Sequence, residues 1–351
     1  MQELVPATPD AIAALPFQHT RLRLWHNLLA VSRMTPEQVE TAPHKLIWPK
    51  DSDLPPDEMI AAWQASPGAR PIDRDMSKAT LSIIYKTLLS GGEAFIGDAI
   101  ERAQDDYLAP ISWEIGYAVV GLPKWLPHPG KRRMRRLEQE LRSAVAALIT
   151  ARRRAPGDTP DLLTRLLAAT HPETGEPMSD AQLVDNLLTF YSAGHATTAM
   201  ALTWTLYLLA RSPAWAERLV SEIATVCGEG AVEARHVELL VETQMVLKEA
   251  MRLYPPAPVL SRLAVKECQF SGVKVAAGSH IVVPIYAVHR HTRLWRDPDR
   301  FDPGRFTPER EARYARTQFM PFGYGQRTCI GMAFALSAVM AYPLRPAAYA
   351  S

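Results

Sequence analysis

The sequence predicts a mainly α-helical protein with small β elements late in the chain. Long segments repeat apolar residues at helical spacing, whereas CQFSGVKVAAGSHIVVPIY (268–286) shows the shorter period of strands. The chain has 351 residues, 47% of them hydrophobic, so it is long enough to bury a large core. These observations favour a helix-rich body that carries a small β element.

The N-terminal part of the chain predicts little regular structure. The stretch TAPHKLIWPKDSDLPPDEM (41–59) is rich in proline and polar residues, which suits an irregular connector. We therefore expect residues 1–56 to form an N-terminal arm and connector, and residues 57–351 to form one helical domain. Within that domain, helical patterns begin at Met76 and continue over 94–122, with a break at Pro110.

A long amphipathic helix with basic ends is predicted over 131–154, KRRMRRLEQELRSAVAALITARRR. Its arginines could mark a binding face, although a solvated helix surface is the favoured interpretation. The next helix is predicted to start at a capping box made by Ser179 and Gln182 and to run to about Ala210. After residue 198 it is apolar on nearly all sides, which predicts that it is buried.

Another helix is predicted over about 236–253, and it ends at Tyr254-Pro255-Pro256. The β-like stretch follows, with Gly272 and Gly278 as turn residues. The histidines at 280, 289 and 291 show no zinc spacing, so we expect them to be structural or exposed.

Charge and cysteine usage exclude several classes of function. A formal net charge of +2 gives no bulk electrostatic attraction to nucleic acid. The N-terminal segment holds no apolar run long enough for a signal sequence or a membrane span. Cys227, Cys268 and Cys329 are widely spaced, which argues against a disulfide scaffold and for a reducing, cytoplasmic location.

The long helix contains a run of small residues, SAGHATTAM (192–200). A glycine inside a helix costs about 1 kcal/mol relative to alanine, and Gly194 is such a glycine. Two interpretations are open. The notch can allow close packing of another helix, which is the favoured reading of this motif alone, or it can receive a flat ligand with the Thr197 hydroxyl at its edge.

Two charged residues stand three apart in KEAMRLYPPAP (248–258), where one helix face brings them together. Glu249 and Arg252 could form only a weak surface pair. A second arginine, such as Arg305 in the loop HRHTRLWRDPDRFDPGRF, would instead let the carboxylate lie buried between two guanidinium groups. Such a cluster would hold a loop in place rather than catalyse a reaction.

The stretch PFGYGQRTCIG (321–331) places Cys329 in a glycine-rich loop just before MAFALSAVM, which reads as a helix. No second cysteine is near enough in sequence to suggest a disulfide or a zinc site. The surroundings of Cys329 must therefore explain why three glycines accompany it.

Taken in order, these motifs resemble those of the cytochrome P-450 family, the heme-thiolate monooxygenases, and more particularly its soluble bacterial type. The matching segment covers about residues 180–335, with weaker helical similarity back to about residue 57. The motifs are Ala193-Gly194-x-x-Thr197-Thr198, Glu249-x-x-Arg252, Phe301-x-Pro303-x-Arg305-Phe306 and Phe322-Gly323-x-Gly325-x-Arg327-x-Cys329-x-Gly331. The resemblance implies a cytochrome P-450 fold in which residues 57–351 bind heme.

The resemblance also implies roles for single residues. Cys329 would be the axial ligand of the heme iron, with its thiolate stabilised by backbone N–H groups and by the following helix. Arg327 and Arg262 would reach the heme propionates. The implied cofactor-binding residues are Cys329, Phe322, Gly323, Arg327, Arg262, Gly331 and Ala193. The implied catalytic residues are Thr197, Thr198 and Gly194, and the implied structural ion cluster is Glu249, Arg252 and Arg305.

Three departures from the family pattern affect these expectations. Ala196 stands where the family carries an acid directly before its threonine, so the proton relay is weakened. No early tryptophan is followed four residues later by the arginine that binds propionates in the family. The match also implies an incomplete fold, shortened in the N-terminal third and at the C-terminus.

By resemblance, the function is insertion of one oxygen atom of O₂ into a small hydrophobic organic substrate. The implied cofactor is heme b, with electrons from a ferredoxin or a flavoprotein reductase and indirectly from NAD(P)H. The alternative is a non-catalytic or incomplete heme-binding remnant. The early departures and short tail favour this alternative, whereas the intact cysteine loop favours the monooxygenase.

Overall fold

The computed structural model describes residues 72–89, 130–155, 161–171, 174–228 and 234–341, with the single positions 117, 126, 127 and 232. The predicted N-terminal arm (1–56) and nearly all of the helical segment predicted at 94–122 lie outside the described residues. Within the described ranges the fold is mainly α with two small sheets, which confirms the predicted class.

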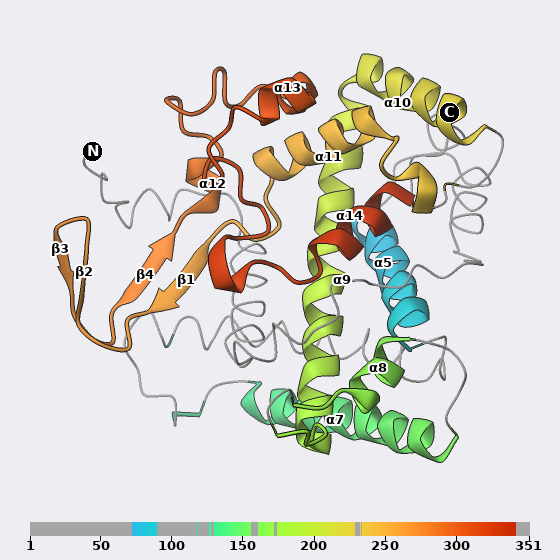
Figure 1. Ribbon diagram of the computed structural model, residues 1–351, viewed down its shortest axis with the longest axis vertical. Helices are drawn as coiled ribbons and strands as arrows, with labels where there is room; N and C mark the ends of the chain where they lie inside the picture. Colours follow the sequence, from blue (N-terminus) through green and yellow to red (C-terminus); the bar gives the residue numbers. More distant parts are fainter. Residues whose placement is uncertain are drawn as a thin grey trace.

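Helices make up most of the described structure (Figure 1). The longer ones are α5 (Ile72–Leu89), α7 (Lys131–Arg154), α8 (Leu162–Ala168), α9 (Asp180–Ala210), α10 (Pro213–Cys227), α11 (Val241–Leu253) and α14 (Met332–Ala341). The short ones are η1 (Ala234–His236), α12 (Ile285–Val288), η2 (Pro303–Phe306), α13 (Pro308–Glu311) and η3 (Gly325–Arg327).

Helix α9 runs through the middle of the molecule, and the other long helices lie around it (Figure 1). It begins as predicted, because the Ser179 hydroxyl accepts the Gln182 N–H at 3.3 Å and the Gln182 side chain accepts the Ser179 N–H at 2.8 Å. Its second half is largely buried, although Tyr207 is 41% exposed. The capping box therefore fixes the start of the helix that carries the small-residue notch.

Two helix starts differ from the sequence prediction. Helix α5 begins at Ile72, ahead of the predicted Met76, and α11 begins at Val241 after a separate 3₁₀ turn. At α11 the reason is a contact from another helix. The Glu222 carboxylate on α10 accepts the N–H groups of Glu242 and Thr243 at 2.6 and 2.9 Å, so it caps α11 from outside.

The β structure consists of two antiparallel pairs. Strands β2 (Cys268–Phe270) and β3 (Val273–Val275) form a hairpin, and β1 (Leu260–Leu263) pairs with β4 (His280–Val283). In that second pair Leu260 lies opposite Val283 and Leu263 opposite His280. The sequence predicted the later strands but not β1, which holds Arg262.

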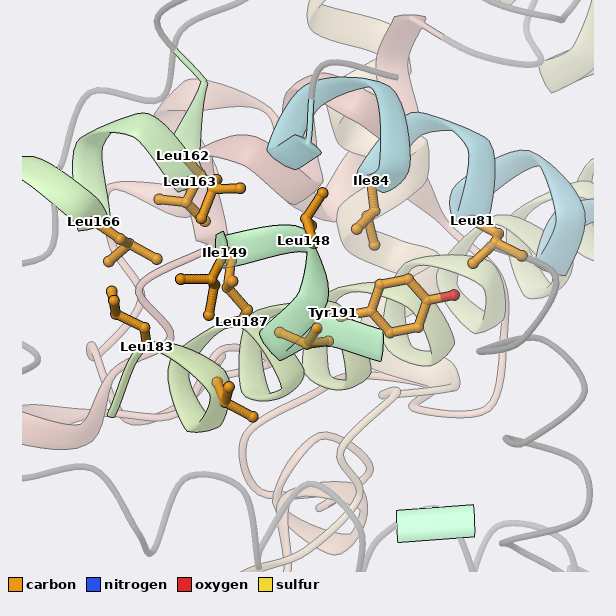
Figure 2. Packing of buried hydrophobic residues seen from close by; sticks show 12 residues of the cluster. Leu81, Ile84, Leu148, Ile149, Leu162, Leu163, Leu166, Leu183, Leu187 and Tyr191 are labelled. Carbon is orange, nitrogen blue, oxygen red and sulfur yellow. The ribbon is translucent and has the colours of Figure 1, made fainter. Parts of the chain in front are cut away.

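Two of the apolar clusters that the described residues form extend along much of α9. The first joins α5, α7 and α8 to its N-terminal half, and Figure 2 shows Ile84, Ile149, Leu163 and Leu187 meeting there. The second joins the later part of α9 to α5, α11 and α14, through the buried residues Met76, Ala199, Ala201, Leu202, Leu206, Leu247, Met251, Val339 and Met340. Phe322 and Leu336 pack against this second cluster, so the cysteine loop and α14 both rest on α9.

Candidate heme-binding site

The cysteine loop has a backbone that glycine favours at two positions. Gly323 has φ +76° and Gly325 has φ +80°, both in the left-handed region. The Gly323 N–H donates to the Met320 carbonyl at 3.0 Å, and the Cys329 N–H donates to the Phe322 carbonyl at 2.8 Å. The loop thus folds back on itself and brings Cys329 beside Phe322.

The Cys329 side chain is solvent-exposed, although protein atoms crowd the sulfur on its other sides. Because these neighbouring atoms exclude water from part of the sulfur, the pKa of the Cys329 thiol is raised above its ordinary value. A hydrogen bond from the Gly331 N–H opposes the rise. The start of α14 three residues later adds its positive dipole end. A glycine loop that donates to an accessible sulfur suits a thiolate that binds a metal.

Strand β1 lies beside the same loop. A Cβ atom on Gly323 would lie 3.5 Å from Leu260 Cδ1, in ordinary contact. Arg262 stands two residues further along β1, so it shares a face of the strand with Leu260. Its side chain is exposed and donates to the Ser261 carbonyl at 2.9 Å, while Arg327 lies in η3 just before Cys329. One guanidinium group therefore lies on a strand beside the loop, and the other lies within the loop itself.

The notch on α9 receives a side chain from α5. A Cβ atom on Gly194 would lie 3.0 Å from Ile84 Cδ1, so this glycine permits close helix packing. The Ala193 carbonyl accepts the Thr197 hydroxyl, one turn later in the helix, at 2.6 Å. Thr198 is buried, whereas Ala193, Ala196 and Thr197 are partly exposed. The geometry favours the packing interpretation for Gly194 and leaves Ala193 and Thr197 accessible.

Glu249, Arg252 and Arg305 form one buried cluster. Arg252 donates two hydrogen bonds to the Glu249 carboxylate, from Nε at 2.6 Å and from Nη2 at 2.8 Å. Arg305 Nε lies 3.3 Å from Glu249 Oε1, and the Asp302 N–H donates to that same oxygen at 2.9 Å. Burial raises the pKa of Glu249, while Arg252, the Asp302 N–H and Arg305 act against the rise.

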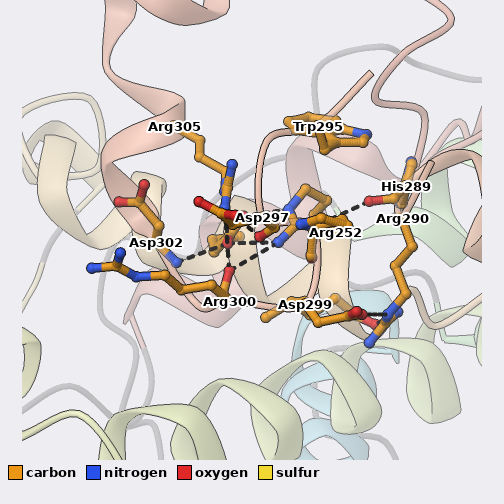
Figure 3. Close-up of polar contacts among 12 residues, drawn as sticks. Arg252, His289, Arg290, Trp295, Asp297, Asp299, Arg300, Asp302 and Arg305 are labelled. Carbon is orange, nitrogen blue, oxygen red and sulfur yellow. Dashed lines mark hydrogen bonds and ion pairs between the residues drawn. The ribbon is translucent and has the colours of Figure 1, made fainter. Parts of the chain in front are cut away.

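This cluster also holds loop backbone that no motif indicated. Arg252 Nη1 donates to the carbonyls of His289 and Pro298 at 2.8 and 2.6 Å, as Figure 3 shows for His289. Its guanidinium lies 5.2 Å from the centre of the Trp295 ring. The arginines therefore hydrogen-bond to the backbone of the chain between α12 and η2.

His289 was missed as part of the site. We expected it to be structural or exposed, and it is structural: its side chain is fully buried, and its Nε2 accepts the Met320 N–H at 3.0 Å. The sequence did not indicate its contact with the segment before the cysteine loop. The contact joins two residues that are distant in the sequence, so no local pattern around His289 could have indicated it. His280 and His291 are exposed.

Comparison with known proteins agrees with this architecture. The sequence model of the family described as "Cytochrome P450" matches residues 56–342. Cyclooctat-9-en-7-ol 5-monooxygenase from Streptomyces melanosporofaciens is 34% identical over 283 residues, which cover 79% of this chain and 60% of that protein. Pentalenene oxygenase from Streptomyces avermitilis is 38% identical over 210 residues, covering 60% of this chain and 46% of that protein.

Solved structures show the same likeness. The crystal structure of a mutant cytochrome P450DA heme domain has a TM-score of 0.72 and 26% identity, and the match covers 93% of this chain and 75% of that one. The chain belongs to the cytochrome P450 family. It spans about 60% of the length of the first curated relatives that it matches. Among the described residues, no helix has the length and apolar character needed to cross a membrane.

Proposed function

We propose that this chain is a heme-thiolate monooxygenase in which Cys329 is the axial ligand of heme b. The observation that carries the proposal is the Cys329 loop, where an accessible sulfur receives the Gly331 N–H and the backbone bond from Cys329 to Phe322 holds the loop closed. Family membership supports the same cofactor. We further propose that residues 57–351 form the single heme-binding domain.

The residues around this loop fit the cofactor. The accessible sulfur would provide a thiolate ligand to the iron, and the guanidinium groups of Arg262 on β1 and Arg327 within the loop would pair with the two propionates. Phe322 offers an aromatic surface beside the sulfur, and it packs against the α9–α14 cluster. When bound, heme supplies reductive activation of O₂ and transfer of one oxygen atom to an organic substrate.

The chain's own residues position the sulfur and the hydroxyl group on α9. The glycine loop fixes the sulfur, and the buried Glu249–Arg252–Arg305 cluster holds the segments behind it. The Thr197 hydroxyl lies on the accessible side of α9, and its Oγ1 donates a hydrogen bond to the Ala193 carbonyl oxygen at 2.6 Å. Ala196 offers no group that could carry a proton to that side.

Electrons would come from a ferredoxin or flavoprotein reductase, and ultimately from NAD(P)H. The substrate would be a small hydrophobic organic molecule, and the relatives' names make pentalenene and cyclooctat-9-en-7-ol the first probes. The cytoplasm is the expected compartment, since the three cysteines are widely spaced and odd in number.

The test is to reconstitute the purified chain with hemin and to record the ferrous carbon-monoxide spectrum. We expect the strongly red-shifted Soret band of thiolate ligation, and we expect Cys329→Ala to abolish it. Cys268→Ala is the matched control, because Cys268 is also exposed but lies on β2. A wild-type chain that never retains heme would contradict the proposal. A chain with the band but no product from either probe or other substrates would indicate the non-catalytic alternative.

A further inference from the structure

His289 contacts Arg252 of the buried ion cluster (Figure 3) and also contacts Met320, in the segment that leads into the cysteine loop. It directly follows α12, and its carbonyl accepts Arg252 Nη1 at 2.8 Å. On the other side, the centre of its ring lies 5.2 Å from the centre of the Phe319 ring. One residue thus contacts both the cluster and the approach to Cys329.

The protonation of the His289 ring follows from its partners. Nε2 lies 3.0 Å from the Met320 backbone nitrogen, which can only donate, so Nε2 must be the unprotonated acceptor. The proton of the neutral ring is then on Nδ1. That atom is buried and completes no hydrogen bond of normal geometry, although the backbone of Met251 and Arg252 beside it favours a proton there.

A short chain of backbone hydrogen bonds connects this contact to the sulfur. The residue that donates to His289, Met320, also accepts the Gly323 N–H through its carbonyl at 3.0 Å. The adjacent Phe322 carbonyl accepts the Cys329 N–H at 2.8 Å. The position of Met320 therefore sets the turn at Gly323, and that turn sets where Cys329 is held.

We propose that His289 is a positioning residue for the Cys329 loop, and that its neutral imidazole fixes Met320 and thereby the sulfur. The geometry is independent of the cofactor, but the effect on heme rests on the proposed function. If the ring only filled space, an apolar side chain of similar size would replace it. If the hydrogen bond matters, the replacement must offer an acceptor at the place of Nε2.

The inference also predicts sensitivity to acid. Arg252 of α11 and the neighbouring Arg290 are the charged groups that act on the ring, while Phe319 and Met320 contribute no titratable side chain. Burial first, and then Arg252, lower the pKa of His289 to about 4. Protonation would place an Nε2–H against the Met320 N–H, so two donors would face each other and the loop would loosen.

The experiment uses the full chain and compares His289→Gln with His289→Leu. Gln can place its amide oxygen near the position of Nε2, whereas Leu has no acceptor. After reconstitution with hemin, we expect His289→Gln to release heme to apomyoglobin at the wild-type rate. We expect His289→Leu to release it roughly tenfold faster, because a buried N–H loses its partner. The carbon-monoxide adduct of His289→Leu should also lose part of its thiolate-type Soret band.

A second measurement needs no heme. In a chain that also carries Cys227→Ser and Cys268→Ser, alkylation by iodoacetamide reports on Cys329 alone. His289→Leu should change that rate, and His289→Gln should not. If wild type takes up no heme, the proposed function fails while this measurement still tests the positioning role. Equal rates in all three chains would overturn the inference, as would equal defects in both variants.

The acid response separates positioning from packing. As the pH falls toward about 4, wild type should lose the thiolate band, and His289→Gln, which has no imidazole to protonate, should keep it to lower pH. If circular dichroism shows that His289→Leu does not fold, the pH profiles of wild type and His289→Gln still test the inference. Identical pH profiles for wild type and His289→Gln would overturn the inference.

Discussion

Ile84 of α5 lies against Gly194 of α9, so closely that a Cβ atom at position 194 would come within 3.0 Å of Ile84 Cδ1. Ile84 is itself buried in the cluster that joins α5, α7 and α8 to α9, so it has little room to move. The glycine in the notch therefore has a packing role that is separate from any ligand.

The first prediction concerns this contact. Gly194→Ala should lower the free energy of unfolding by about 1 kcal/mol, because overpacking typically costs 1–3 kcal/mol and improved helix propensity returns about 1 kcal/mol. Ile84→Val removes the methyl that the new Cβ would meet. In a double-mutant cycle from urea melts, Gly194→Ala should be less harmful, or even stabilising, in the Ile84→Val background. Strictly additive effects would show that the two residues do not interact.

The second prediction concerns Glu249. Its carboxylate is fully buried and receives donors from Arg252, Arg305 and the Asp302 backbone. Glu249→Ala leaves two buried guanidinium groups without their counter-charge, so it should destabilise the fold by about 3–5 kcal/mol. Chemical denaturation or the yield of folded protein measures the loss.

Arg218 and Glu242 provide the matched control, because they form a bidentate pair on the surface, where Arg218 is 52% exposed. Arg218→Ala should cost about 1 kcal/mol or less. If Glu249→Ala were as mild as Arg218→Ala, burial would not determine the energetic importance of the cluster.

These two sites show what a sequence can predict and where it stops. The i, i+3 spacing placed Glu249 beside Arg252, and the capping box placed the start of α9, because both relations are local along one helix. The Ile84–Gly194 contact joins residues more than a hundred positions apart, so the sequence left two interpretations of the notch open.

Backbone donors and acceptors are equally invisible in a sequence, since every residue carries them. The Asp302 N–H on Glu249 and the Met320 N–H on His289 have no side-chain signature. Strand β1 was missed for a related reason: its four residues gain their strand conformation by pairing with β4, and little in LSRL itself indicates it. The sequence named Arg305 as a possible second partner of Glu249, and in the structure its Nε lies 3.3 Å from that carboxylate.

The third prediction concerns stability in acid. His289 has a pKa of about 4 in the folded chain against an ordinary 6.5, so the unfolded chain binds a proton more readily between those values. The stability that comes from neutral His289 is fully present above about 6.5 and is lost as the pH falls toward 4. The difference corresponds to about 3 kcal/mol, at 1.36 kcal/mol for each pKa unit.

Urea melts across this pH range, compared between wild type and His289→Gln, isolate this contribution from that of the carboxylates. His291 is exposed, so His291→Gln should reproduce the wild-type pH dependence. If His289→Gln loses as much stability in acid as wild type does, His289 is not the group responsible.

The last prediction concerns the use of electrons and rests on the proposed function. Thr197 gives its hydroxyl proton to the Ala193 carbonyl at 2.6 Å, and Ala196 beside it carries no acid. A positioned general acid typically contributes about 10²–10⁴-fold to such chemistry. We therefore expect wild type to use most of its electrons to reduce O₂ to peroxide or water. Ala196→Glu should raise the amount of product formed per NADPH consumed.

Ala196→Gln is the control, because Gln has nearly the same size as Glu and can form hydrogen bonds but cannot ionise near neutral pH. An equal gain in both variants would point to altered packing around α9 rather than to proton delivery, and efficient coupling in wild type would mean that a residue other than Ala196 or Thr197 supplies the proton.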